Sequence, residues 1–276
     1  MKKFYRRFLL KATFICIGFS SLVLSSCSSL QEVPNSLNMP LPEKIHEVKT
    51  RIDIGTGGLG LQASYAIDSH VVLISSTKWN YAFKSATDQD GGPISIYHNE
   101  WVEDIGVGYF KKLNDKIRFE VMGGLGLSFT KFSSLYENLD LAGDSYYDDY
   151  FNGNIIHVFT QADLGIVHRA FALGIGVRLS DRYYTGNYEN FQIINQGGFH
   201  QFTDDKYRLN VNTFYVEPGI VASFGRGFLK YNIIFGLSIN TTGFELNPAI
   251  AHNEAAWLPL MPIFLSTGFT YRIHGK

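Results

Sequence analysis

The segment FALGIGVRLS, residues 171–180, alternates strictly between two kinds of side chain. Its odd positions are large and apolar, and its even positions are Ala, Gly, Gly, Arg and Ser. Successive side chains of a β-strand point to opposite faces, so this spacing predicts a strand with one apolar face and one small or polar face. The same alternation recurs around 48–54, 59–67, 104–109, 117–130, 229–240 and 263–272.

Two further segments, 70–83 and 207–223, alternate less cleanly, and Pro218 interrupts the second. The connections between the predicted strands alternate in length. The short ones are 66–70, 111–116, 167–170 and 224–228, and the long ones are 85–93, 133–154, about 183–206 and about 242–259. In an antiparallel meander this order places all short turns at one end and all long loops at the other, as in a transmembrane β-barrel.

The number of strands follows from the first predicted hairpin. Val48 to Ile54 alternates as a strand, and Thr56-Gly57-Gly58 is a suitable turn before the strand at 59–67. With this strand the fold class is all-β, an antiparallel up-and-down barrel of about ten strands, an even number as in single-chain bacterial barrels. Eight strands with a frayed first segment is the alternative.

Alternation alone does not tell which face meets water, because a soluble lipocalin-type barrel buries its apolar face inside. Charged residues make up only 18% of the chain, against about 25% in typical globular proteins, and aromatic residues reach 15%. The small face carries many glycines, which relieve crowding inside a narrow barrel: Gly106, Gly108, Gly124, Gly126, Gly174, Gly176, Gly236 and Gly268. We therefore expect the apolar face to point outward into lipid.

Aromatic residues gather near the predicted strand ends, where their apolar rings and polar tips suit the two membrane interfaces. They are Trp79, Tyr81, Trp101, Tyr109, Phe110, Tyr150, Phe151, Phe171, Tyr183, Tyr184, Phe228 and Tyr231. Open sheet edges are not tolerated in lipid, so we expect a closed barrel.

Two stretches, LGLQASYAIDSHVVLIS and EDIGVGYFKKLNDKIRFEVMGGLGLSF, resemble the hairpins of small outer-membrane β-barrel proteins, the OmpA/OmpX-like or "porin family" barrels. The resemblance covers roughly residues 48–274 and implies a bacterial outer-membrane location. It rests on strand pattern and loop asymmetry, without a catalytic signature. Such barrels usually end on an aromatic residue, whereas this chain continues past Tyr271 to Lys276, so the corresponding signal is expected at Phe269 or Tyr271.

The N-terminus reads as a targeting segment, with Lys2, Lys3, Arg6 and Arg7 ahead of an apolar stretch. Leu24-Ser25-Ser26-Cys27 resembles a bacterial lipobox, which implies a lipoprotein signal peptide at 1–26 and a covalent lipid on Cys27. An ordinary signal peptide is the alternative. Residues 27–47, with three prolines, are expected to form a flexible tether before the barrel domain at 48–276.

Charges of both signs fall on the predicted inner face, where they can pair: Arg118, Glu120, Asp163, Arg178, Glu217, Lys230 and Arg272. A barrel of about ten strands has little internal space, so we expect these residues to form a network that fills or nearly fills the lumen. A small-solute channel is the rival hypothesis.

Catalysis is not indicated, although some outer-membrane barrels are lipid-modifying enzymes or proteases. The eight histidines scatter over predicted turns, loops and ends without a Ser/His/acid pattern. The acidic loops Asp88–Gly91 and Asp144–Asp149 do not match a calcium motif in full, so no metal or cofactor is expected. A net charge of -1 gives no indication of nucleic-acid binding.

The sequence thus predicts a non-enzymatic, lipid-anchored outer-membrane β-barrel. Its partners are expected to be membrane lipid and, through Tyr-rich outer loops, proteins or glycans. The expected role is in envelope structure, adhesion or support of a membrane complex.

Overall fold

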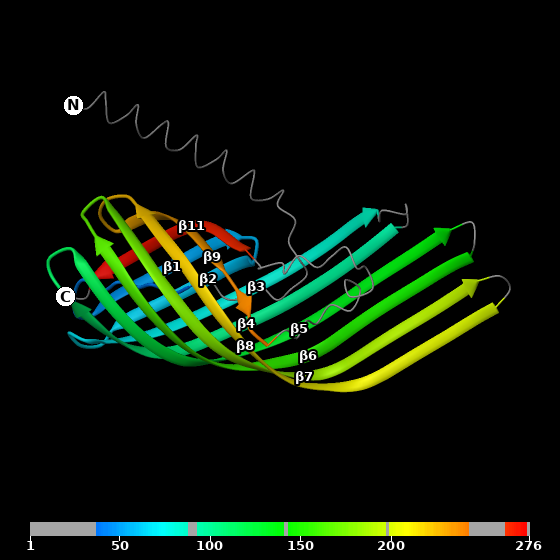
Figure 1. Cartoon of the computed structure of the whole chain (residues 1–276). Coiled ribbons are helices and arrows are strands. Elements are labelled where there is room, and N and C mark those ends of the chain that lie inside the picture. The colour runs from blue at the N-terminus through cyan, green and yellow to red at the C-terminus, as the bar shows by residue number, and fades with distance from the viewer. Residues whose placement is uncertain (1–36, 88–92, 141–142, 197–198, 243–262, 275–276) are drawn as a thin grey trace, which may run out of the picture.

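The structure, a computed structural model, describes residues 37–87, 93–140, 143–196, 199–242 and 263–274. This part of the chain is all-β, and ten antiparallel strands close into a barrel (Figure 1). The elements are β1 (Glu47–Gly55), β2 (Gly58–Ala66), β3 (Val71–Thr87), β4 (Pro93–Lys112), β5 (Ile117–Asp140), β6 (Gly143–Val167), β7 (Phe171–Gln196), β8 (Phe199–Phe224), β9 (Leu229–Leu237), β10 (Ile239–Asn240) and β11 (Ile263–His274). The described residues include no helix long and apolar enough to cross a bilayer.

Each barrel strand has a neighbour on both sides. Strand β1 pairs with β2 and also with β11, and β11 in turn pairs with β9, which pairs with β8. The predicted first strand and its turn after Gly55 are therefore confirmed, and they give ten strands instead of eight. The ring of ten strands is therefore closed.

Strands β9 and β10 together form one barrel strand that is interrupted beside a proline. Residues Gly219–Phe224 of β8 pair with β9, and Tyr215 and Val216 pair with β10 in the same register. Pro218 lies at the interruption and has no N–H to donate. The sequence break at Pro218 thus removes a hydrogen bond from the sheet without ending β8.

The strands differ greatly in length. Strands β1, β2 and β9 have nine residues, whereas β5 to β8 have 24 to 26. A bilayer-spanning strand needs only about 9–11 residues. We call the end with the connections 67–70, 113–116, 168–170 and 225–228 the short-turn end. The opposite end, where β3 to β8 extend as long hairpins past the short strands, is the hairpin end (Figure 1).

The prediction of long loops at 133–154 and 183–206 is wrong. Strand β5 continues to Asp140 and β6 begins at Gly143, and β7 continues to Gln196 before β8 begins at Phe199. Both faces of these extensions carry polar residues, so the apolar-polar alternation that identifies a strand disappears there. Of the other two predicted loops, residues 88–92 and 243–262 lie outside the described residues.

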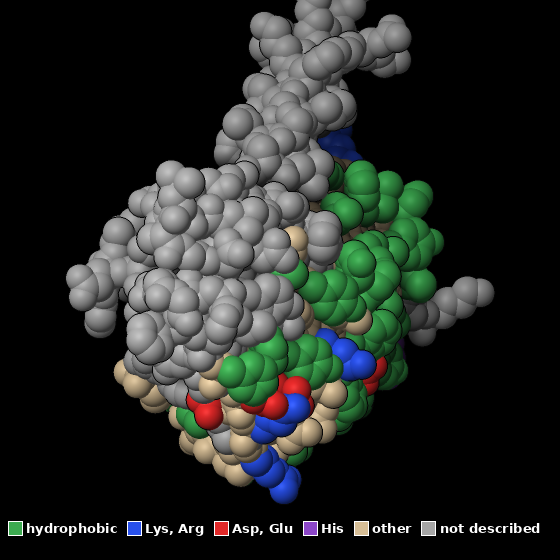
Figure 2. Space-filling model, turned by 90° about the vertical axis from the view of Figure 1, so that its right-hand side faces the viewer, with side chains coloured by type: hydrophobic (Ala, Val, Ile, Leu, Met, Phe, Trp, Pro, Cys, Tyr) green, Lys and Arg blue, Asp and Glu red, His purple; other side chains and the backbone are tan. Residues whose placement is uncertain are grey.

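The orientation of the two faces matches the prediction. In β7, Ile175 is 52% exposed on the outer surface, whereas Arg178 is 3% exposed inside the barrel. Figure 2 shows hydrophobic side chains side by side along the outer flank of the molecule. The inner face is crowded: a Cβ atom placed on Gly124 would lie 2.6 Å from the ring of Phe159. Glycine therefore makes room for larger neighbours.

The outward-facing aromatic residues lie near both ends of the short strands. Trp79, Trp101 and Phe129 are direct neighbours across β3, β4 and β5. At the short-turn end Phe228 stacks edge-on against Tyr271, with ring centroids 5.5 Å apart. Three residues expected in these belts instead point inward, and they are Phe110, Phe151 and Tyr184. Each follows another aromatic residue, and neighbours along a strand face opposite ways.

Candidate functional site

The lumen near the short-turn end contains a segment of the protein's own N-terminal region. Residues 37–42, which we call the plug segment, are all buried, and Leu37 is completely so. Together with Val167, Ala172, Val221, Ile234 and Phe264 its apolar side chains form one hydrophobic cluster. Residues 27–47 were expected to be a flexible tether, but residues 37–42 of this range are buried inside the barrel, and Lys44 to His46 are exposed.

Polar groups of the wall hold the backbone of the plug segment. Lys49 Nζ donates to the carbonyl oxygens of Pro40 and Leu41, at 2.6 and 2.7 Å. Arg51 Nη2 donates to the carbonyl of Leu37 at 2.8 Å, and Gln161 Nε2 donates to that of Asn38 at 2.9 Å. These contacts satisfy carbonyl groups that would otherwise be buried without partners.

Glycines of β6, β7 and β8 shape the wall to the plug segment. A Cβ atom on Gly165 would lie 2.5 Å from Leu41, and one on Gly174 would lie 2.9 Å from the sulfur of Met39. One on Gly219 would lie 2.5 Å from Leu37. Leu41 also has a φ of 43°, a left-handed conformation that costs a branched residue free energy. The surrounding contacts must supply that energy, which indicates a specific docking site.

A buried polar network lies across the lumen beyond the plug segment. Asp104 accepts a hydrogen bond from Ser76 Oγ at 3.2 Å, forms an ion pair with Arg178 at 3.4 Å and is hydrogen-bonded to His157 Nε2 at 2.7 Å. Arg178 also donates to Gln161 Oε1 at 3.0 Å, which links the network to the plug segment. Several strands thus converge on one carboxylate, which fixes the side chains across the lumen.

The geometry of this network differs from a nucleophile–base arrangement. In a Ser–His–acid triad the serine hydroxyl donates to the histidine, whereas here Ser76 donates to Asp104. The expectation that the histidines lie on turns, loops and ends is wrong for two of them. His98 and His157 are buried on the inner faces of β4 and β6.

Two further groups of charges lie inside the barrel. Arg182 pairs with Glu217, which also accepts a hydrogen bond from Ser238 at 3.2 Å. The guanidinium of Arg182 lies 4.2 Å from the centre of the Tyr215 ring, a favourable cation–π position. Lys78 and Glu100 form a second buried pair at 3.1 Å. Within these two pairs the opposite charges compensate each other, as burial requires.

The other predicted lumen residues do not all join one network. Glu120 and Asp163 are both buried and stand directly opposite each other on β5 and β6. Asp163 accepts a hydrogen bond from Gln161 at 2.8 Å. Arg118 is directed to the turn instead, where its Nη1 donates to the carbonyls of Asn114 and Ile117.

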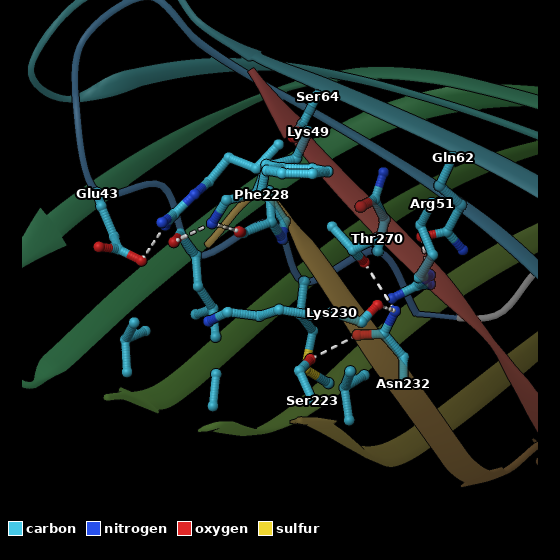
Figure 3. A pocket seen from close by; sticks show the side chains of 18 of the residues that line it. Glu43, Lys49, Arg51, Gln62, Ser64, Ser223, Phe228, Lys230, Asn232 and Thr270 are labelled. Carbon is cyan, nitrogen blue, oxygen red and sulfur yellow. Dashed lines mark hydrogen bonds and ion pairs between the residues drawn. The ribbon is translucent and has the colours of Figure 1, made fainter. Parts of the chain in front are cut away.

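Lys230 and Arg272 lie at the short-turn rim, beside a pocket of about 60 Å³ under the plug segment (Figure 3). Arg272 pairs with Glu43, and Lys49 pairs with Glu47 at 3.1 Å. Partial burial raises the pKa of Glu43, but attraction to Arg272 and Lys49 outweighs it and holds this pKa below its usual value of 4.5. Glu43 is therefore a charged clamp on the residues that precede β1.

The sequence analysis did not assign six further polar or charged residues to the lumen. They are all buried inside the barrel: Arg51, Lys78, Glu100, Asp104, His157 and Arg182. These residues could have been placed inside from the alternation of side chains along each strand, because every second residue points to the same face. Asp104, for example, stands two positions before Gly106 and therefore on the same inward face. The partner of each charge was not visible, because it comes from another strand.

Several predicted features fall outside what the structure describes, among them the signal peptide at 1–26, Cys27, the loop 88–92, and the side chains of Asp144 to Asp149. Among the described residues, no group of three or more His, Cys, Asp or Glu side chains is placed to hold a metal ion.

A comparison with models of known protein families gives no match, and a comparison with curated protein sequences gives none either. What is established for this chain is a closed antiparallel β-barrel of ten strands with a charged, packed interior.

Proposed function

We propose that the protein is a bacterial outer-membrane lipoprotein whose β-barrel spans the bilayer and has no enzymatic activity. One observation carries the proposal: large apolar side chains cover the outside of a closed barrel whose inside is lined by charges. Leu61, Ile105, Leu125, Ile175 and Ile220 are examples from five different strands, and each is exposed. Soluble monomers rarely expose contiguous apolar patches larger than a few hundred Å², so a lipid environment accounts best for this belt.

The filled lumen supports a structural or interactive role over a channel. The plug segment occupies the lumen near the short-turn end. The network of Asp104, Arg178 and Gln161 lies across the lumen on the hairpin side of this segment. Open aqueous channels are found in barrels of about sixteen strands, well above the ten seen here. We infer that solutes do not pass through the folded barrel.

The long hairpins support a role in binding. Their outer faces beyond the Trp79–Trp101–Phe129 row carry polar residues, among them Asn99, Lys131, Asn187 and Lys206. Strands that continue well past the bilayer hold such a surface away from the membrane. Adhesion or support of a membrane complex, with a protein or glycan as partner, is the function that this shape fits best.

Membrane insertion is tested with the purified full-length protein. A folded barrel is expected to migrate faster on a detergent gel before heating than after it, and to fractionate with the outer membrane. Lipid labelling is expected to be lost in Cys27→Ala while heat-modifiability remains. A soluble protein without a heat-dependent shift would overturn the barrel-in-membrane proposal.

The filled lumen is tested separately in planar bilayers. The expected result is an absence of stepwise conductance after insertion of the wild-type protein. Reproducible conductance steps would favour the small-solute channel. Incubation with lipopolysaccharide checks the enzymatic alternative, since a deacylated or acylated product would contradict the non-enzymatic assignment.

A further inference from the structure

The short-turn end exposes mainly basic side chains. In residues 43–46, in the four short connections and in the last two residues of β4, the exposed acidic side chains are Asp68 and Asp115. Asp115 is already paired with Lys112, at 3.4 Å. The exposed basic side chains of the same stretches are Lys44, Lys111, Lys112, Lys116, Arg169 and Arg226. This end therefore presents a net positive charge.

On the outer face of β4 the charge changes sign from one end to the other. Ile105, which is 65% exposed, and Tyr109 belong to the apolar outer face. Lys111 continues this face toward the short-turn end, and Glu103 continues it toward the hairpin end. Glu103 accepts a hydrogen bond from Trp101 Nε1 at 3.0 Å. A cation thus bounds the apolar face on one side and a carboxylate on the other.

The same order recurs at β7, three strands away in the ring. Every second residue from Phe171 to Leu179 is apolar and exposed. Arg169 is exposed in the connection just before this face, and Asp181 is exposed where the face continues toward the hairpin end. Two separate strands therefore place a basic residue at the short-turn boundary of their apolar face.

Aromatic rings lie next to these basic residues. His70 stacks on Tyr109 and His168 stacks on Phe171, each with ring centroids 5.5 Å apart. In a barrel that spans a bilayer, such rings lie at the level of the lipid headgroups. Lys and Arg side chains at this level lay their hydrocarbon stems along the apolar surface and extend their charged groups into the headgroup layer.

The basic residues surround the barrel instead of clustering on one side. Lys44 precedes β1, Lys111 and Lys116 flank the connection from β4 to β5, Arg169 lies between β6 and β7, and Arg226 lies between β8 and β9. A docked protein would contact one contiguous patch, whereas lipid contacts the whole perimeter. The distribution of charge therefore fits lipid headgroups better than an acidic protein.

We propose that the short-turn end is a binding surface for anionic phospholipids, with Lys111, Lys116 and Arg169 contacting the headgroup phosphates of the surrounding leaflet. Ammonium and guanidinium groups both form charge-assisted hydrogen bonds with phosphate oxygens. The inference rests on the proposed function, because only a barrel that spans the bilayer holds these side chains at headgroup level. It adds a preference for one lipid class in the leaflet next to the short turns.

The preference is measured with purified full-length protein in phosphatidylcholine vesicles that contain a trace of spin-labelled lipid. Electron paramagnetic resonance gives the fraction of spin label immobilised on the protein surface, separately for labelled phosphatidylglycerol and labelled phosphatidylcholine. The wild-type protein is expected to favour phosphatidylglycerol about two- to fivefold at low salt. At about 1 M salt, where the screening length is about 3 Å, most of this preference is expected to disappear.

Two matched triple variants locate the binding surface. Lys111→Gln/Lys116→Gln/Arg169→Gln removes two lysines and one arginine at the short-turn end, and it is expected to lose most of the preference. Lys131→Gln/Lys206→Gln/Arg208→Gln removes the same residue types from exposed positions of the extensions and is expected to retain it. Lys111→Arg/Lys116→Arg keeps the charge and is also expected to retain it.

The possible outcomes separate this inference from the proposed function. Heat-modifiability and co-flotation with the vesicles are checked first for every variant, and a wild-type protein that fails both would overturn the proposed function and this inference together. An inserted wild-type protein that binds both lipids equally would overturn the inference alone. Loss of the preference in the extension variant, with retention in the short-turn variant, would also overturn it.

Discussion

The part of the barrel enclosed by all ten strands and the extensions of β3 to β8 contain similar residue types in opposite environments. In the enclosed part Asp104 and Arg178 form an ion pair at 3.4 Å, and each side chain is 3% exposed. In the extensions Glu189 and Lys206 form one at 3.6 Å, with side chains 44% and 59% exposed. The distances are similar, but only the enclosed pair has lost its contact with water.

The outer faces of the two regions differ in the same way. In the enclosed part every second residue of β7 from Phe171 to Leu179 is large, apolar and exposed. In the extension of the same strand, Thr185, Asn187 and Glu189 continue that face. In the proposed membrane location, lipid contact accounts for the strict pattern on the outer face of the enclosed part, and this pattern is relaxed in the extensions. We therefore expect the contribution of a side chain to the free energy of unfolding to depend more on its environment than on its chemical type.

The largest expected effect comes from removing one partner of the enclosed ion pair. Asp104→Asn leaves the buried Arg178 without its carboxylate, and this is expected to lower the free energy of unfolding by about 3–5 kcal/mol. The matched change Lys206→Gln is expected to cost less than about 1 kcal/mol, because its pair is exposed. Urea unfolding in lipid vesicles measures both, and equal losses would contradict the comparison.

A smaller effect is expected from a charge on the outer face. In the proposed membrane location, Ile175→Lys places an ammonium group in the hydrocarbon layer and is expected to lower the free energy of unfolding by about 2–4 kcal/mol. Phe202→Lys, on the outer face of the extension, is expected to lose only its edge contact with Phe191, worth about 1 kcal/mol. The same unfolding measurement applies. If Ile175→Lys were as mild as Phe202→Lys, the enclosed part would not face lipid.

The smallest effect concerns pH at the short-turn rim. The pKa of Glu43 is lowered in the folded protein, so its contribution to stability is present above about pH 4.5 and is lost as the pH falls through the lowered value. Acidification through the lowered pKa is expected to reduce the protection of residues 37–46 against hydrogen exchange, after correction for the intrinsic pH dependence of exchange, by less than about 1 kcal/mol.

Glu43→Gln is expected to show the reduced protection already at neutral pH, and this protection is expected to lose its dependence on pH. Asp115→Asn serves as the control, because its pair with Lys112 is exposed and lies at another turn. An unchanged exchange rate of residues 37–46 in Glu43→Gln would show that this clamp does not hold the segment in place.

The amino-acid sequence by itself determined the enclosed barrel. Alternation in segments such as Phe171–Ser180 fixes which side chains share a face, and the short connections fix which strands are neighbours, so ten strands and their orientation could be predicted. In Gly143–Asn154 neither set of alternate residues is consistently apolar, so the sequence has no such period, and the extensions of β5 and β6 were predicted as loops.

Only the tertiary structure decided what fills the lumen. Arg178 could be assigned to the inside, but its contacts with Asp104 on β4 and Gln161 on β6 depend on strand register and on the depth of each side chain. The plug segment carries a composition typical of a linker, with Pro40 and Pro42. It is ordered because β1, β6 and β8 bring Arg51, Gln161 and Gly219 around it, a constraint that arises only when the ring closes.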